Sequence, residues 1–163
     1  MKLSAWLCTV APLLIACSES SGEGSDNPSN ADISIAEGTL SGKVGGKPWS
    51  LVTAQTDAFL SADDPEFWID FYAEAVTACT MPMGVSQNHI ILHVPKTPGD
   101  YRLSLSLNGT FVIDGETTDN LVATKGRILV DQVSDASVRG GFTMQYDQNN
   151  SVSGHFEAKI CAE

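Results

Sequence analysis

Basic residues are scarce in this chain of 163 residues: Lys and Arg number 9 against 20 Asp and Glu, which gives a net charge of −11. A surface of this sign repels a polyanion, so we expect no nucleic acid among its partners. Long hydrophobic runs are scarce too. The apolar stretch that begins at Leu3 ends at Ala16, which is too short for a helix that spans a bilayer. The length suits one ordinary domain.

The sequence also lacks the common motifs of catalysis. It has no Gly-x-Ser-x-Gly nucleophile elbow, no zinc-protease helix and no phosphate-binding loop. Its paired carboxylates, Asp63 and Asp64, do not have the spacing of a calcium loop. We therefore expect a non-catalytic protein without a cofactor, although catalytic groups that assemble only in space leave no such motif.

The amino-terminal residues have the composition of an export signal, with Lys2 as its charged region and residues 3–16 as its apolar region. They lead into Leu14-Ile15-Ala16-Cys17, which resembles the lipobox of bacterial lipoproteins. The resemblance implies cleavage before Cys17, a thioether from its sulfur to diacylglycerol, and a further acyl chain such as palmitate on the new amino terminus. Two acyl chains anchor a protein stably to a membrane. The alternative is an ordinary secretory signal, with Cys17 a plain thiol.

Ser18 follows the lipobox cysteine. In lipoproteins of two-membrane bacteria an aspartate at this place favours inner-membrane retention, so the resemblance implies transfer to the outer membrane. Residues 18–32 have no aromatic or large aliphatic side chain to bury, which predicts a flexible tether. The expected division is a signal peptide at 1–16, a lipidated tether at 17–32 and one β domain at 33–163.

Four cysteines divide by position. Cys8 leaves with the signal peptide and Cys17 takes the lipid, which leaves Cys79 and Cys161. An oxidising export compartment favours a disulfide between these two. The alternative is a pair of free thiols, with Cys79 available to a metal. The nearby residues that suit monovalent copper are Met81, Met83 and His89.

From Ile33 onward the pattern is typical of β-strands. Segments 38–44 and 47–54 flank Gly45-Gly46, and a two-residue hairpin turn favours two such glycines. The cross-strand pairs that this turn predicts are Leu40 with Leu51 and Gly42 with Trp49.

Two further hairpins are predicted from the same alternation. A three-residue loop at 107–109, with Gly109 in the left-handed conformation, predicts the pairs Leu103 with Ile113, Leu105 with Phe111 and Arg102 with Asp114. An odd-length loop centred on Asn149 joins two alternating segments near the end of the chain. The pairs that it predicts are Phe142 with Phe156, Val138 with Ile160 and Arg139 with Lys159.

Three other segments complete the expected sheet. Residues 66–72 are dense in aromatic and β-branched side chains, which favours a strand over a helix opened by Asp64-Pro65. Residues 89–94 and 121–130 also alternate, the second with Gly126 as a bulge. The domain is therefore expected to be all-β, with about eight antiparallel strands in a β-sandwich or a small up-and-down barrel.

The candidate contact residues are two aromatic side chains. Trp68 and Tyr72 lie opposite the core face of their strand, so we expect them to be exposed to a partner. The alternative is that they cover the other face of the sheet within the core. His89, His93 and His155 occupy polar strand positions. The first two lie about 13 Å apart along one strand, too far to bind a single metal ion, and no metal site is expected.

Three functional interpretations remain open. The leading one is a lipid-anchored outer-membrane protein that acts as a binding or assembly module for another envelope protein. The second is a carrier of a small apolar ligand, in a barrel similar to lipocalins in architecture alone. The third is a small hydrolase, which requires a histidine to meet a buried carboxylate and a nucleophile in a cleft.

Overall fold

The computed structural model describes residues 33–80, 88–115 and 117–162. These residues contain an eleven-stranded sheet and one short helix. The elements in chain order are β1 (Ser41–Val44), β2 (Lys47–Ser50), β3 (Thr53–Thr56), α1 (Ala58–Ser61), β4 (Glu66–Tyr72), β5 (His89–Pro95), β6 (Gly99–Arg102), β7 (Gly109–Ile113), β8 (Asp119–Ala123), β9 (Lys125–Val133), β10 (Ser137–Asp147) and β11 (Asn150–Lys159).

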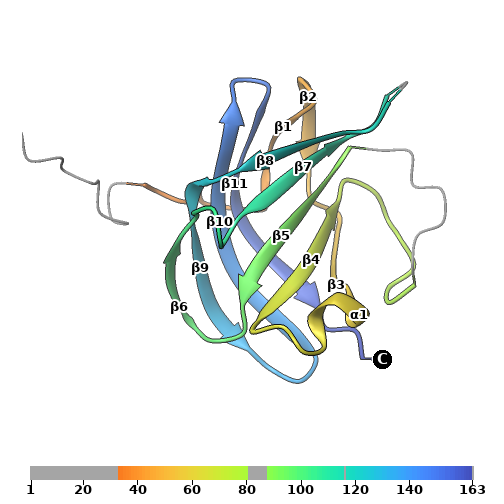
Figure 1. The fold of residues 1–163 in the computed structure, drawn as a ribbon, viewed down its shortest axis with the longest axis vertical. Helices are drawn as coiled ribbons and strands as arrows, with labels where there is room; N and C mark the ends of the chain where they lie inside the picture. Colours follow the sequence, from red (N-terminus) through yellow and green to blue (C-terminus); the bar gives the residue numbers. More distant parts are fainter. Residues whose placement is uncertain (1–32, 81–87, 116, 163) are drawn as a thin grey trace, which may run out of the picture.

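The strands form one continuous sheet that curls into a half-barrel (Figure 1). Its order is β6-β9-β10-β11-β3-β4-β5-β7-β8, and β1 pairs with β11 and with β2. The ladders between these strands are antiparallel, except that Lys159 of β11 pairs in parallel with Gln55 of β3. The all-β class is confirmed, although the strands do not follow one another around the sheet in chain order.

Apolar side chains fill the inside of the curl. Phe71 contacts Phe142 and Phe156 edge to face, with ring centroids 5.2 Å apart in both pairs. Other large side chains that are completely buried around them are Leu40, Ile69, Ile90, Leu92, Phe111 and Ile128. The alternation predicted for residues 66–72 and 89–94 is confirmed. Burial of this apolar area, at roughly 25 cal/mol per Å², is the main stabilising contribution to the fold.

The first hairpin, β1 with β2, has the predicted register. Gly42 lies opposite Trp49, and the amide of Leu51 donates to the carbonyl of Leu40 at 2.9 Å. The two turn glycines have φ angles of 61° and 74°. A side chain with a Cβ is strained in this conformation, whereas glycine is not.

The hairpin predicted around Asn108-Gly109 is wrong. β6 pairs with β9, whereas β7 pairs with β5 and β8, so the two segments lie apart in the sheet. Leu103 and Leu107 are both buried in the core. Between them Ser104 closes a turn by donating its amide to the carbonyl of Leu107 at 2.7 Å. Burial of two leucines stabilises a loop here, and the local alternation gave no sign of it.

The last hairpin has the predicted strands in a different register. Arg139 lies opposite Glu157 instead of Lys159, because the turn is tighter than expected. The carboxylate of Asp147 accepts a hydrogen bond from the amide of Asn149 at 2.8 Å within that turn. A shift of two residues keeps the same side chains on the core face, and it brings Arg139 Nη2 to 2.9 Å from Glu157 Oε1.

The single strand predicted over residues 121–130 is in fact two strands, separated at Thr124. β8 pairs with β7, and β9 pairs with β6 and β10, so the chain changes partners at this point. Gly126 lies within β9 in regular register opposite Met144, and the irregularity of that ladder falls near Gly140 instead. The predicted bulge at Gly126 is therefore wrong.

Candidate functional site

Trp68 lies on the outer face of β4 and is half-buried. Its ring packs on that of His93 in β5 with centroids 3.9 Å apart, and its indole Nε1 donates to Asp64 Oδ2 at 3.3 Å. His93 Nδ1 lies 3.4 Å from Glu66 Oε2. Burial raises the pKa of Glu66, against the lowering effect of His93. Neighbours on both sides thus hold Trp68 in a defined orientation.

Tyr72 does not have the predicted exposure. Only 4% of it is exposed, because it lies on an inner strand between Thr53 of β3 and His89 of β5. Its hydroxyl donates a hydrogen bond to the carboxylate of Asp70, and burial, followed by Asp70, raises the pKa of Tyr72. The alternative interpretation, in which this residue covers the other face of the sheet within the core, agrees with the burial of Tyr72, although Tyr72 is not part of the main core cluster.

The three histidines do not converge on one site. His89 and His93 are half-buried on β5 and pack on different aromatic rings, while His155 lies on β11. Within the described ranges, no group of three or more His, Cys, Asp or Glu side chains is placed to hold a metal ion. Met81 and Met83, the methionines of the copper alternative, lie outside the described residues.

The predicted disulfide between Cys79 and Cys161 is present. The amide of Cys79 donates to Gln55 Oε1 at 2.8 Å, and that of Cys161 donates to Thr56 Oγ1 at 2.9 Å. Gln55 and Thr56 are consecutive buried residues at the end of β3. The bridge and the strand therefore fix each other in place, and the oxidised Cys79 offers no thiolate to a metal.

The helix α1 lies between β3 and β4, where the strand pattern gave no indication of one. Asp57 Oδ1 caps it by accepting from the amide of Leu60 at 2.8 Å, and the amide of Asp57 donates to Trp68 O at 2.7 Å. At its other end, Ser61 Oγ accepts from the Trp68 amide at 3.0 Å, and Ser61 O accepts from Lys96 Nζ at 2.5 Å. The aspartate before a short apolar run is a helix-start signal that the sequence does contain.

This short helix presents two apolar side chains to solvent. Phe59 is 81% exposed and Leu60 is 45% exposed, while Ser61 is buried against β4. Because hydrogen bonds join both ends of α1 to β4, the ring of Phe59 projects from a fixed element. Exposed aromatic side chains on a rigid support are typical of protein recognition surfaces.

Two clefts flank α1. The first has a volume of about 200 Å³ and is lined by Asp57, Phe59, Asp70 and the disulfide. The second has a volume of about 320 Å³ and is lined by Phe67, Lys96, Ile160 and the same end of β3. We refer to α1 and these two clefts together as the α1 surface.

The first cleft carries negative charge. The pKa of Asp70 is raised from 3.8 to about 6, mainly by burial and further by the carboxylate of Asp57, against a lowering effect of the Tyr72 hydroxyl. At neutral pH Asp70 is thus mostly ionised, at an energetic cost. Among the described residues, no ion pair joins Asp57 or Asp70 to a basic side chain.

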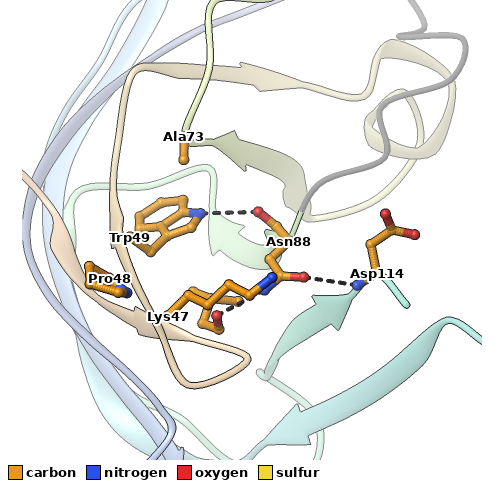
Figure 2. Close-up of a pocket in the computed structure, with 7 residues that line it drawn as sticks. Lys47, Pro48, Trp49, Ala73, Asn88 and Asp114 are labelled. Atoms are coloured by element: carbon orange, nitrogen blue, oxygen red, sulfur yellow. Dashed lines mark hydrogen bonds between the residues drawn. The ribbon is translucent and has the colours of Figure 1, made fainter. Parts of the chain in front are cut away.

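Another cavity, of about 280 Å³, lies beside the β1–β2 hairpin and is lined by Lys47, Trp49, Asn88 and Asp114. Figure 2 shows the indole of Trp49 directed at the carbonyl of Asn88, at 3.1 Å, and the side-chain amide of Asn88 directed at the backbone on both sides. These polar groups already join the hairpin to β5 and β7. The α1 surface has an exposed ring and two carboxylates for which the described part of the chain provides no ion-pair partner, and it is therefore the better candidate site.

Comparison with known proteins found no matching family model, no matching curated protein and no matching solved structure. Among the described residues, no helix has the length and apolarity needed to cross a membrane.

Proposed function

We propose that this chain is a lipid-anchored outer-membrane lipoprotein whose β domain acts as a non-catalytic binding or assembly module. The anchor is proposed at Cys17, from its lipobox resemblance. The observation that carries the binding role is α1, which holds Phe59 exposed beside a negatively charged cleft. We assign Trp68 to the margin of this surface, and Tyr72 to the support of Asp70 rather than to partner contact.

The place where the chain enters the domain supports this arrangement. Ile33, the first described residue, accepts a hydrogen bond from Arg127 Nη1 of β9 at 3.1 Å. The same guanidinium donates to both carboxylate oxygens of Asp100 at 2.9 and 3.0 Å. In Figure 1 this entry point lies at the left of the domain, while α1 lies at the lower right near the carboxyl terminus. A tether from Cys17 would thus leave α1 accessible.

The interior of the domain offers no comparable support for a ligand carrier. The rings of Phe71, Phe142 and Phe156 occupy the inside of the curl. Carriers of small apolar ligands need a lined cavity on the order of 300 Å³ or more in that place. His93 gives no support to a hydrolase either, because its imidazole packs on Trp68 and lies beside the carboxylate of Glu66.

Mass spectrometry of the mature amino terminus tests the proposed anchor, together with fractionation of cells that express the wild type or Cys17→Ser. We expect a diacylglyceryl group on Cys17 and membrane association that the substitution abolishes. An unmodified amino terminus, or a variant that stays with the membrane, would contradict the anchor.

The binding role is tested by recovery of partners from envelope extracts with the wild-type chain and with Trp68→Ala. Tyr146→Ala is the matched control, because Tyr146 is an exposed aromatic residue on β10, away from α1. We expect at least one envelope protein to be depleted with Trp68→Ala and retained with Tyr146→Ala. Equal recovery of every partner with all three chains contradicts the assignment of Trp68.

A further inference from the structure

The proposed function does not specify the chemistry of the partner. The side chains of the α1 surface indicate what that chemistry is. Transfer of an exposed phenylalanine ring from water to an apolar environment lowers the free energy, so an apolar side chain of a partner that covers the ring is bound favourably. Phe59 and Leu60 are adjacent and exposed, and the second cleft continues the apolar surface with Phe67 and Ile160. One component of the partner is therefore apolar.

The charge around α1 supplies the second component. Residues 57–70 contain five acidic residues and no basic one. Lys96, the basic side chain in the second cleft, donates to Ser61 O and lies with Nζ 5.3 Å from the centroid of the Phe67 ring. The first cleft is lined by the carboxylates of Asp57 and Asp70. Complementarity therefore requires a positively charged group on the partner.

Phe59 and the two aspartates line the same cleft, and this combination indicates which positively charged group of the partner binds there. Phe59 lines the cleft that contains Asp57 and Asp70, so a lysine or arginine side chain that enters it meets an aromatic residue and two acidic residues together. An aromatic face attracts such a cation, and a carboxylate binds it through charge-assisted hydrogen bonds. An anionic lipid headgroup has the wrong sign for this cleft.

We propose that the α1 surface docks a basic segment of a partner protein, with apolar side chains over Phe59 and Leu60 and one lysine or arginine in the cleft between Asp57 and Asp70. This proposal rests on the function proposed above and specifies the chemistry of its partner. Occupation of the cleft by a cation favours the charged form of Asp70, so binding weakens as the pH falls below about 6, the pKa of that carboxyl.

The test uses the mature chain in a nonionic detergent and fluorescently labelled synthetic peptides, with binding followed by fluorescence anisotropy. The probe is a short peptide of alternating leucine and arginine. Two matched peptides replace arginine by glutamate or leucine by serine, and thereby reverse the charge or remove the apolar component. We expect the leucine–arginine peptide to bind at least about tenfold more tightly than either of the others.

Substitutions on the protein locate the site. Phe59→Ser and Asp70→Asn are each expected to weaken binding of the leucine–arginine peptide by about tenfold. The matched controls are Leu105→Ser, at a leucine that is 88% exposed in another loop, and Asp63→Asn, at an exposed carboxylate outside both clefts. Neither control is expected to change the affinity. Thermal unfolding of each variant confirms that it is folded.

Several results overturn the proposal. The first is equal affinity for the three peptides, and the second is unchanged affinity in either Phe59→Ser or Asp70→Asn. The third is an equal loss of affinity in the control variants, because such a loss indicates nonspecific attraction to an acidic protein. Mass analysis of Cys17 in the same sample keeps the two proposals separate. A modified terminus without selective peptide binding refutes only the docking site, whereas selective binding by an unmodified chain refutes only the anchor.

Discussion

Cys79 and Cys161 are covalently joined across 82 residues of sequence, and consecutive residues of β3 bind their two amides. The bridge therefore links the carboxyl terminus to the segment that follows β4, at a strand end that both clefts share. Closing a loop of this length removes conformational freedom from the unfolded chain.

The disulfide is expected to make a large contribution to stability. In the chain-entropy model, a loop of this length corresponds to about 4–5 kcal/mol. We expect Cys79→Ser with Cys161→Ser to lower the free energy of unfolding by an amount of this order, as measured by urea denaturation. Dithiothreitol should bring the wild type to the same midpoint and leave the double variant unchanged. If the double variant is as stable as the oxidised wild type, the assigned bridge does not constrain the unfolded chain.

Asp70 is expected to make stability depend on pH. Its pKa of about 6 in the folded protein exceeds the ordinary 3.8, so the folded state binds its proton more tightly than the unfolded state. This contribution is complete below the unfolded value and is lost as the pH rises through about 6. Since a tenfold difference in proton affinity corresponds to about 1.4 kcal/mol, the loss is on the order of 2–3 kcal/mol.

The variant Asp70→Asn isolates this effect, because the amide oxygen can still accept from the Tyr72 hydroxyl but cannot ionise. We expect it to be more stable than the wild type above the pKa of Asp70, with the difference vanishing near pH 4. Chemical denaturation across this range measures the difference. Asp63→Asn, at an exposed position, should follow the wild type. A difference that stays constant with pH argues against a raised pKa at Asp70.

Local signals in the sequence were sufficient for some elements and not for others. The Gly45-Gly46 turn fixes the register of β1 and β2 because the paired residues are close in the chain and the turn conformation demands glycine. The pairing of β6 with β9 could not be found in this way. Leu103 ends the alternation by turning into the core, and the partner strand lies more than twenty residues further along. Nothing local specifies that partner.

The candidate site, too, could be predicted from the sequence only in part. Cys79 and Cys161 could be paired from the sequence because the predicted export signal implies an oxidising compartment, and the other two cysteines were assigned to the signal peptide and the lipobox. The cleft beside them combines β3, α1, β4 and the carboxyl terminus, and the closeness of Asp57 to Asp70 follows only from the pairing of β3 with β4. The aspartate before α1 was a usable signal for the helix. The exposure of Phe59, however, depends on which side of that single turn packs on β4.

Asn88 is expected to matter for stability although it lines a cavity. Its Nδ2 donates to Val44 O at 2.9 Å, and its Oδ1 accepts from the amide of Asp114 at 2.9 Å. Asn88→Ala leaves both backbone groups without these partners, which typically costs about 1–3 kcal/mol. Urea denaturation measures the loss. Asn108→Ala, which removes one exposed hydrogen bond to Leu105 O, should lower the free energy of unfolding much less. Equal losses would contradict a stabilising role for the two hydrogen bonds of Asn88.

Gly126 is expected to tolerate no side chain. A Cβ at this position would lie 2.1 Å from the carbonyl oxygen of Thr143 in β10, well inside van der Waals contact, so the paired strands must separate. We expect Gly126→Ala to destabilise the protein by more than the ~1 kcal/mol that is typical of a point substitution. Gly38→Ala is a suitable comparison, because it has a positive φ but no atom within 4 Å of its Cβ position. Equal effects would mean that backbone conformation, rather than strand packing, sets the cost at Gly126.

Phe59 and Phe67 line the same surface, but we expect Phe59 to have a functional role and Phe67 a structural one. Phe67 is 8% exposed and Phe59 is 81% exposed, so replacement by alanine should have very different costs. Loss of a buried phenylalanine costs about 3–5 kcal/mol, whereas an exposed side chain without partners changes stability by about 0.5 kcal/mol or less. Urea denaturation of Phe59→Ala and Phe67→Ala measures both. A large loss in Phe59→Ala would show that its ring packs within the domain, and the reason to regard it as a docking residue would disappear.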